Sequence, residues 1–288
     1  MRRTIFETVA HEPRMAKGAL PGDAGAGEAP QAMRFGPWLA MTTLTLALGG
    51  CVRAAGGPAT APAGEAAGVP YFEVTTGGAR ADERLPMLVV MHGRNGAPEP
   101  LVPTFTRLGV RARVVFLRGD PLGHGRATWW REDQYTDGMA VTAAAIARRE
   151  AQVVEAVGAL VRGRPTLGRP VLVGRSQGGV LALAIALRDP DWTSAVFALS
   201  SFLPPELFAI PADGGVSRPP IHAFHGDEDE RIPIEQARDT VNRLHALGYP
   251  IKLTEYEEMG HEVRKVELAI LLPEIEQALA RQAAAPAR

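Results

Sequence analysis

The chain has 288 residues, of which 46% are hydrophobic, an ordinary fraction for a globular protein with one good core. Its formal net charge is −1 at pH 7, which argues against a nucleic-acid partner, because such a partner favours a strongly basic face. Cys51 is the single cysteine. The chain therefore forms neither an internal disulfide nor a cysteine-based metal cluster.

Residues 33–50 have the pattern of a bacterial lipoprotein signal. An arginine near the start is followed by an apolar run from Trp38 to Leu48, which is too short to span a bilayer and is typical of a signal-peptide hydrophobic region. The run ends in Leu-Gly-Gly-Cys, which resembles the lipobox whose cysteine is lipid-modified and becomes the mature N-terminus. We expect an exported protein anchored through Cys51 to a bacterial membrane, on the periplasmic or surface face. The alternative is a loose N-terminal helix with a chance cysteine.

The segments on either side of this signal have different compositions. Residues 1–32 carry acids as well as bases, unlike the start of a signal peptide, and we expect an over-extended or unstructured N-terminus there. Residues 51–70 are almost all alanine, glycine and proline, which is typical of a flexible tether. The folded domain is therefore expected over residues 71–288.

Within that domain, short apolar segments alternate with segments of helical spacing. The apolar segments predict strands at 86–91, 110–117, 170–173, 194–199, 221–224 and 251–256. The helical spacing predicts helices at 139–161, 177–187, 234–247 and 263–281. This succession predicts a single α/β domain, with a mostly parallel sheet and helices on both faces.

Ser176 lies in the sequence Gly-Arg-Ser-Gln-Gly at 174–178, between a predicted strand and a predicted helix. In a sharp strand-to-helix turn of this kind, a side chain at either glycine would collide with neighbouring backbone, and the serine is held in a strained conformation. Only five serines occur in the chain, so a chance match in this context is uncommon. We predict that Ser176 is a nucleophile, with a purely structural turn as the alternative.

A serine nucleophile needs a base, and the base needs an acid to orient it. Among the histidines that follow Ser176, we favour His261, because it lies between the last predicted strand and the last predicted helix. Active-site groups of open α/β sheets gather at the carboxyl ends of the strands. The acid is expected in the turn after residue 224, where Asp227, Glu228 and Asp229 all qualify by position.

Four motifs together resemble the carboxylesterase/phospholipase branch of the α/β-hydrolase superfamily, which includes acyl-protein thioesterases. They are His-Gly-Arg-Asn-Gly at 92–96, Gly-Arg-Ser-Gln-Gly-Gly at 174–179, His-Gly-Asp-Glu-Asp-Glu-Arg-Ile-Pro at 225–233 and Met-Gly-His-Glu-Val at 259–263. The resemblance implies the α/β-hydrolase fold and a serine esterase. It also selects Asp229 as the acid, through the family's His-Gly-x-x-Asp-x-x-Val-Pro element, and leaves Asp227 as the alternative.

An oxyanion hole requires two backbone N–H groups. One should belong to Gln177, which follows the nucleophile and begins a helix whose dipole adds to the effect. The resemblance implies Arg94 as the second, because His-Gly-Arg matches the family's His-Gly-x element. The chain departs from the family pattern at Arg175, where an aromatic or hydrophobic residue is common. Arg175 either favours an acidic substrate group or points to solvent.

The substrate pocket is expected to involve two apolar segments. Trp129 and Trp130 stand in a loop, and at least one should face an acyl or aryl group; the alternative is that one only plugs the core edge. Residues 201–220 are rich in proline and are expected to wall the same cleft, with Phe202 and Leu203 as candidate contacts.

We therefore predict a hydrolase of small to medium acyl or aryl esters that works through an acyl-enzyme and needs no metal or cofactor. Its partners are a small-molecule ester and, through the lipid anchor, a membrane. Within hydrolases, a thioesterase or a lysophospholipase is the alternative. From a different class, the alternative is a lipid-anchored binding module on a hydrolase fold, whose triad is idle.

Overall fold

The computed structural model describes residues 63–131, 139–209 and 218–284. The chain divides into two units, residues 1–53 and 54–288, and all described residues belong to the second unit. The predicted signal at 33–50 and the lipidation site at Cys51 lie outside the described residues. Within the described part of the chain, no helix combines the length and hydropathy that a membrane span requires.

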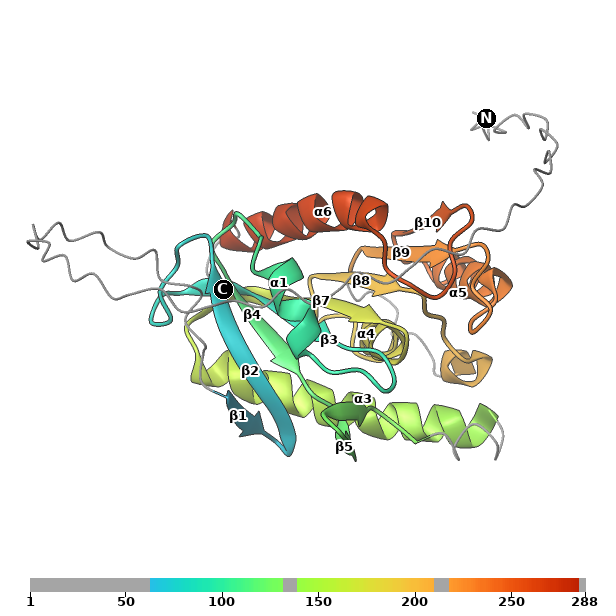
Figure 1. The fold of residues 1–288 in the computed structure, drawn as a ribbon, viewed down its shortest axis with the longest axis horizontal. Helices are drawn as coiled ribbons and strands as arrows, with labels where there is room; N and C mark the ends of the chain where they lie inside the picture. The colour runs from blue at the N-terminus through green and yellow to red at the C-terminus, as the bar shows by residue number, and fades with distance from the viewer. Residues whose placement is uncertain (1–62, 132–138, 210–217, 285–288) are drawn as a thin grey trace, which may run out of the picture. The chain divides into compact units, whose positions relative to one another are not determined.

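An eight-stranded sheet forms the centre of the second unit (Figure 1). Its strand order is β1-β2-β4-β3-β7-β8-β9-β10. β2 pairs antiparallel with β1 and β4, and every other neighbouring pair in this sheet is parallel. The mostly parallel sheet expected from the sequence is confirmed. The strands are β1 (Ala63–Ala66), β2 (Val69–Thr76), β3 (Leu85–Met91), β4 (Ala112–Leu117), β7 (Thr166–Arg175), β8 (Ala195–Leu199), β9 (Ile221–Gly226) and β10 (Ile251–Tyr256).

The sheet begins at Ala63, inside the segment that the sequence suggested as a tether. β1 pairs with β2 from Ala63 opposite Phe72 to Ala66 opposite Val69. Val69 is fully buried. Backbone hydrogen bonds hold an edge strand without large side chains, so an alanine- and glycine-rich segment joins the sheet although its composition resembles a linker.

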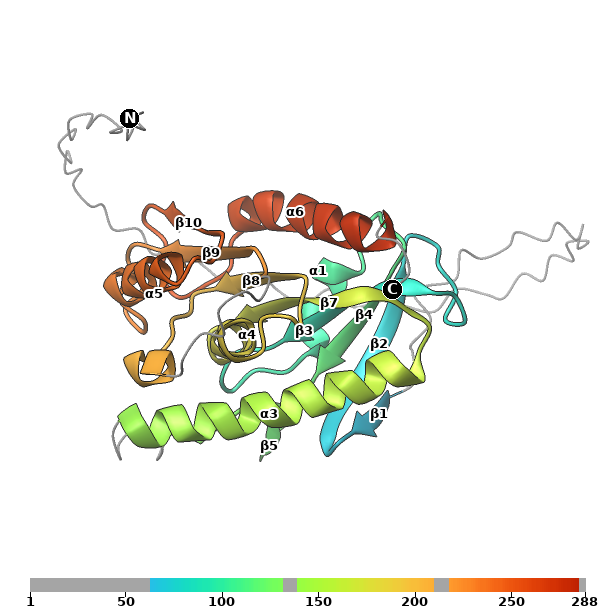
Figure 2. The same ribbon diagram turned by 180° about the vertical axis from the view of Figure 1, so that it is seen from behind.

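Helices cover both faces of the sheet, as Figures 1 and 2 show from opposite sides. One face packs against α3 (Met139–Gly163), α4 (Gln177–Arg188) and α5 (Ile234–Ala246), and the other against α1 (Val102–Phe105) and α6 (Lys265–Ala284). The remaining elements are short: a hairpin of β5 (Asp120–Gly123) and β6 (Arg126–Thr128), and the 3-10 helices η1 (Glu99–Leu101) and η2 (Pro205–Ala209).

Alternate residues of the strands feed two separate apolar cores. In β7, Leu172 points to the core shared with α3 and α4, whereas Val171 and Val173 point to the core shared with α6. Parallel strands that are buried on both faces read as continuous apolar runs, which is why the sequence predicted them well. In α4, every residue from Gln177 to Leu187 is buried.

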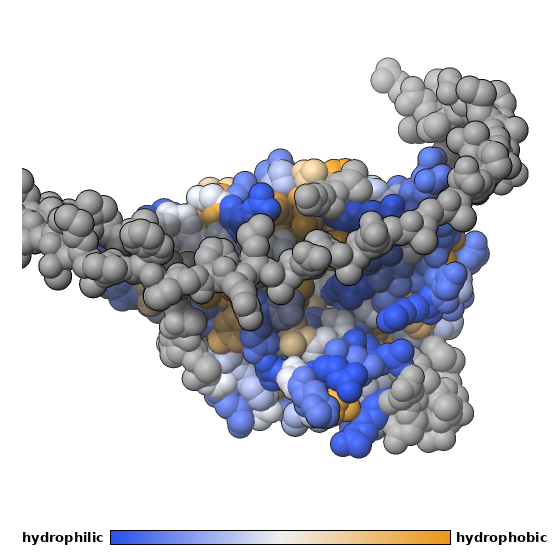
Figure 3. Space-filling view, viewed as in Figure 1, coloured by the Kyte–Doolittle hydropathy of each residue, from blue (hydrophilic) through white to orange (hydrophobic). Residues whose placement is uncertain are grey.

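The other helices are amphipathic. In α5, the buried residues Ile234, Ala237, Thr240 and Leu244 recur every three or four positions. The space-filling view is accordingly mostly hydrophilic over α5 and β10 (Figure 3). The fold thus gives one helix, α4, a fully buried position directly after β7.

Candidate active site

A sharp turn joins β7 to α4 and carries Ser176. The backbone of Ser176 has φ 53° and ψ −122°, a conformation that L-residues rarely adopt. A Cβ atom at Gly174 would lie 2.1 Å from the carbonyl oxygen of Gly178, and one at Gly178 would lie 2.3 Å from the carbonyl oxygen of Met91. Glycine is therefore required on both sides of the serine, as the motif suggested.

Ser176, His261 and Asp229 form a continuous line of hydrogen bonds. His261 Nε2 lies 3.1 Å from Ser176 Oγ, and His261 Nδ1 lies 2.7 Å from Asp229 Oδ2. His261 stands in the loop between β10 and α6, and Asp229 in the turn between β9 and α5. The structure therefore brings together, at the carboxyl ends of three strands, the three residues that the sequence suggested as nucleophile, base and acid.

Asp229 is held as a carboxylate although it is buried. Burial acts to raise its pKa, but N–H donors from Ile232 and Arg231, both 3.0 Å from Oδ1, and the bond from His261 bring the pKa below the usual value. His225 Nε2 also lies 3.3 Å from Oδ2. Asp227, the alternative acid, is exposed. Asp229 is thus the carboxylate of this turn that touches His261.

His261 carries the properties of a neutral base. Because the Asp229 carboxylate accepts from Nδ1, that nitrogen holds the proton and Nε2 is free to accept the proton of Ser176 Oγ–H. Burial lowers the pKa of His261 below its usual value, although Asp229 acts in the opposite direction. The imidazole is therefore neutral near pH 7, which is the form that accepts a proton.

The loop after β3 packs directly against the turn of Ser176. A Cβ atom at Gly93 would lie 3.3 Å from the Cβ of Ser176. The loop is closed by the N–H of Gly96, which donates to the carbonyl oxygen of Gly93 at 3.1 Å. Gln177 and Arg94, whose N–H groups are the expected oxyanion donors, therefore belong to segments that meet at the nucleophile.

The side chain of Gln177 has a role that the sequence did not indicate. Its Oε1 accepts hydrogen bonds from the N–H of Trp129 and from Thr128 Oγ1, both at 3.0 Å, and its Nε2 donates to the carbonyl oxygen of Trp130 at 3.0 Å. This buried amide fastens the loop at 128–130 to the first turn of α4. A glutamine beside a nucleophile is the only signal that the sequence offered for this contact.

His92 is a second side chain whose role the sequence did not reveal. Its Nε2 accepts from the N–H of Gly119 at 3.0 Å, so Nδ1 holds the proton and donates to the carbonyl oxygen of Gly93 at 2.7 Å. Burial lowers its pKa, which keeps the ring neutral. Trp129 stacks on this ring at 5.0 Å and donates through Nε1 to the carbonyl oxygen of His92. The buried His92 ring thus fixes the backbone of the loop after β3 through its hydrogen bond to Gly93.

The aromatic and apolar pocket candidates pack mainly into the core. Trp129 and Trp130 are 1% and 4% exposed, which agrees with the alternative in which they plug the core edge. They border a hollow of about 310 Å³ beside α3, which Ser176 and His261 do not line. Leu203 is buried and Phe202 is half-buried against the same core. Contact of these four side chains with substrate stays a prediction.

The side chain of Arg175 does not simply point to solvent, which was one of the two alternatives considered from the sequence. Its Nη2 donates a hydrogen bond to the carbonyl oxygen of His261, and the side chain is half-buried. The guanidinium therefore points to the histidine loop and not to bulk solvent; a contact with an acidic substrate group stays a prediction.

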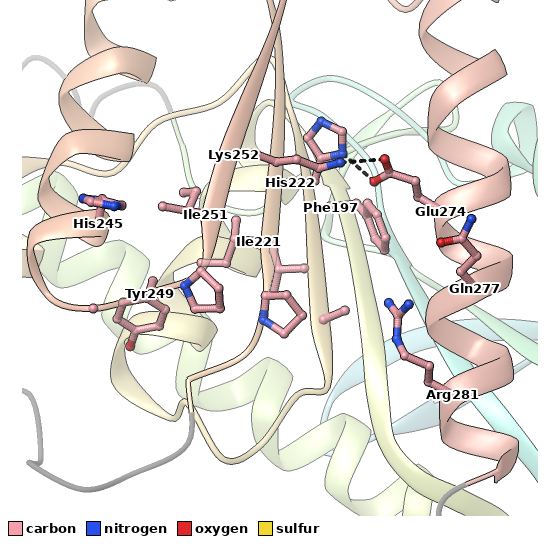
Figure 4. A pocket seen from close by; sticks show the side chains of 15 residues that line it. Phe197, Ile221, His222, His245, Tyr249, Ile251, Lys252, Glu274, Gln277 and Arg281 are labelled. Carbon is pink, nitrogen blue, oxygen red and sulfur yellow. Dashed lines mark hydrogen bonds and ion pairs between the residues drawn. The ribbon is translucent and has the colours of Figure 1, made fainter. Parts of the chain in front are cut away.

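A larger hollow, of about 670 Å³, lies away from this site (Figure 4). Phe197, Ile221 and Lys252 from β8, β9 and β10 line it together with Glu274 from α6. None of Ser176, Asp229 and His261 lines it, so it is not the cleft in front of the nucleophile. Among the described residues, no group of three or more His, Cys, Asp or Glu side chains could hold a metal ion.

Comparison with protein families identifies the chain. The family model for phospholipases and carboxylesterases matches residues 119–279, which is more than half of the chain. The chain belongs to the phospholipase/carboxylesterase family. The match contains Ser176, Asp229 and His261 and begins after the loop at 92–96. This family assignment agrees with the resemblance carried by the four sequence motifs.

Relatives of the family share part of the chain. Acyl-protein thioesterase 1 of Gibberella zeae is 35% identical over 104 residues, 35% of this chain and 44% of that protein. A protein of Oryza sativa named a probable inactive carboxylesterase is 32% identical over 96 residues, 33% of this chain and 39% of its own length. The matched segment thus spans less than half the length of these relatives.

Solved structures show the same fold over a longer stretch. Esterase PE8 superposes with a TM-score of 0.61 at 22% identity, covering 76% of this chain and 99% of that structure. The carboxylesterase of Bacillus cereus superposes with a TM-score of 0.55 at 14% identity, covering 73% and 94%. At such identities these structures establish the α/β-hydrolase fold and not a substrate.

Proposed function

We propose that this protein is a serine hydrolase that cleaves carboxylic esters through an acyl-enzyme. The observation that carries the proposal is the unbroken hydrogen-bonded line from Asp229 through His261 to Ser176. The nucleophile stands on a strained turn at the start of a buried helix, where its hydroxyl is presented at the carboxyl ends of the strands.

Each group has a defined part in the proposed reaction. Ser176 Oγ attacks the ester carbonyl carbon while its proton passes to His261 Nε2, and the Asp229 carboxylate stabilises the imidazolium. The carbonyl oxygen becomes an oxyanion that accepts from the N–H groups of Gln177 and Arg94. Collapse expels the alcohol, which takes the proton from Nε2. Water then attacks the acyl-enzyme by the same route and releases the carboxylic acid.

The proposed substrates are esters with small to medium acyl or aryl groups. The relative named acyl-protein thioesterase supports a thioester as the second candidate, because the same nucleophile and oxyanion donors serve both carbonyl groups. A matched pair of butyryl oxygen ester and butyryl thioester separates the two preferences through the ratio of their kcat/KM values. A lysophospholipase activity would appear as release of fatty acid from lysophosphatidylcholine.

A binding module without turnover is the competing function. The rice relative named a probable inactive carboxylesterase shows that such a possibility has to be tested within this family. In this chain, however, nucleophile, base and acid all lie within hydrogen-bond reach, which supports catalysis. The binding-module hypothesis predicts saturable ligand binding with no product.

Covalent labelling tests the proposal directly. The full chain is treated with a fluorophosphonate probe, and the adduct is located by mass spectrometry. We expect the adduct on Ser176 and its loss in Ser176→Ala, with labelling retained in Ser194→Ala, whose hydroxyl donates to the carbonyl oxygen of Pro170 and not to a member of the triad. A folded wild-type protein that takes up no probe would overturn the hydrolase mechanism and favour the binding module.

We also propose that Cys51 is lipid-modified and anchors the protein to a bacterial membrane. The proposal rests on the apolar run and the Leu-Gly-Gly-Cys sequence at 48–51. Expression of the full chain in a bacterium should yield a membrane-bound protein whose N-terminal peptide carries acyl groups, and Cys51→Ala should abolish both. Recovery of the wild type without acyl groups would refute the anchor.

A further inference from the structure

Arg175 contacts each of the segments that form the candidate active site. It immediately precedes Ser176, its Nη2 donates to the carbonyl oxygen of His261, and its Nη1 lies 3.6 Å from the position of a Cβ atom at Gly93. The guanidinium therefore lies where the nucleophile turn, the loop after β3 and the histidine loop meet. A contact that joins residues 86 positions apart in sequence is one that fixes their relative position.

The histidine loop has few other backbone attachments. Between β10 and α6, the carbonyl oxygen of Met259 accepts from the N–H of Glu228 at 3.1 Å, and Arg264 donates to the carbonyl oxygen of Glu258 at 2.6 Å. His261 itself is held by its ring, through Asp229, and by its carbonyl oxygen, through Arg175. The Arg175 bond is therefore the described contact that joins the His261 backbone to the residue before Ser176.

Burial lowers the pKa of Arg175, whereas the carboxylates of Glu267, Asp229 and Glu262 act in the opposite direction. The hydrogen bond to the carbonyl oxygen of His261 gives this half-buried guanidinium a protein acceptor.

A cavity beneath Arg175 makes the arrangement testable. The cavity has a volume of about 180 Å³ and is lined by Arg175 and by apolar side chains that include Phe105, Val263, Leu268 and Leu271. An unbranched apolar residue at position 175 fits this surrounding, so removal of the guanidinium leaves the packing of the stem. The polar contact and the packing of this side chain are therefore separable by mutation.

We propose that Arg175 is a positioning residue that holds the His261 backbone at the distance required for proton transfer from Ser176. The inference rests on the proposed hydrolase function and adds a residue to it. It differs from both earlier interpretations of Arg175, because the guanidinium acts on the loop of the protein's own base.

Steady-state kinetics test this role by comparing Arg175→Met with the wild type on p-nitrophenyl butyrate. We expect kcat to fall 10- to 100-fold with KM within about twofold, because loss of the anchor misplaces the base by a fraction of an ångström to 1 Å. Arg175→Lys retains one cationic donor and should recover part of kcat. Arg238→Met, on an exposed arginine paired with Glu255, is the matched control and should keep wild-type kinetics.

The outcomes separate the two proposals. If the wild type is neither labelled by fluorophosphonate nor active on the ester, the proposed function fails. If the wild type is active and Arg175→Met keeps kcat within twofold, the positioning role alone is overturned. An increase in KM confined to anionic esters, at constant kcat, would also overturn it, because it would show that Arg175 binds substrate. Urea unfolding of each variant distinguishes a loss of kcat from a loss of folded protein.

Discussion

Replacement of Gly178 by alanine is the sharpest test of the backbone packing under the nucleophile. A methyl group at this position would lie 2.3 Å from the carbonyl oxygen of Met91 and 2.7 Å from that of His92. Ordinary contacts of a Cβ atom begin near 3.4 Å, so β3 and the first turn of α4 must separate by about 1 Å. Both contacts are backbone atoms within a close-packed core, so no side-chain rotation relieves them.

We expect Gly178→Ala to destabilise the protein by about 3 kcal/mol, at the upper end of the cost of overpacking a core. The same displacement moves the N–H of Gln177 away from the loop of Arg94. Because a 1 Å misplacement of catalytic groups costs on the order of 100-fold, kcat/KM should fall by about that factor even where the variant remains folded.

Urea unfolding gives the stability difference, and hydrolysis of p-nitrophenyl butyrate by the folded fraction gives the activity. Gly163→Ala is the matched control, since no heavy atom lies within 4 Å of a Cβ at that position in α3. It should be neutral or stabilise the protein by up to about 1 kcal/mol. A Gly178→Ala protein within about 0.5 kcal/mol of the wild type, with more than half its activity, would refute the packing argument.

Three further predictions follow from the described contacts. Because burial lowers the pKa of His261, its neutral form persists below pH 6.5. The pH at which kcat/KM reaches half its plateau should therefore lie below 6.5, and a half-plateau pH above 6.5 would contradict this. Gln177→Met leaves the buried N–H of Trp129 without an acceptor, and urea unfolding should show a loss of about 1–3 kcal/mol. An unchanged midpoint would argue that the Gln177 amide does not hold the loop at 128–130. Glu73→Leu removes the carboxylate 3.1 Å from the buried guanidinium of Arg113, and the free energy of unfolding should fall by about 3–5 kcal/mol; a neutral result would mean that this charge is not desolvated.

The sequence predicted most parallel strands and the long helices well because their patterns are local, although only residues 170–173 of β7 were predicted as a strand. The predicted segments at 86–91 and 251–256 agree with β3 and β10 to within one residue. The sequence did not predict β1, because hydrogen bonds to β2, and not its side chains, place this segment in the sheet. The sequence did not predict the β5–β6 hairpin either. Both strands are short and β5 is exposed, so the hairpin shows no alternation of apolar and polar residues.

The candidate site divides in the same way. The turn around Ser176 has a sequence signature because its glycines are required by close backbone contacts. The hydrogen bonds of the Gln177 and His92 side chains join segments tens of residues apart, and no local pattern indicates them. The bond from Arg175 to His261 spans 86 positions, which is why the sequence left the direction of that arginine undecided.

The complete burial of α4 has a consequence for how this family can acquire new substrates. A helix with no exposed residue from Gln177 to Leu187 has little freedom to accept substitutions, and it carries the nucleophile at its first turn. The segments at 92–98, 200–204 and 257–264 connect larger elements and border the same turn. Selection of this chain for a new ester in the laboratory should therefore accumulate substitutions in those segments and leave α4 nearly invariant, so that chemistry and specificity evolve on separate parts of one domain.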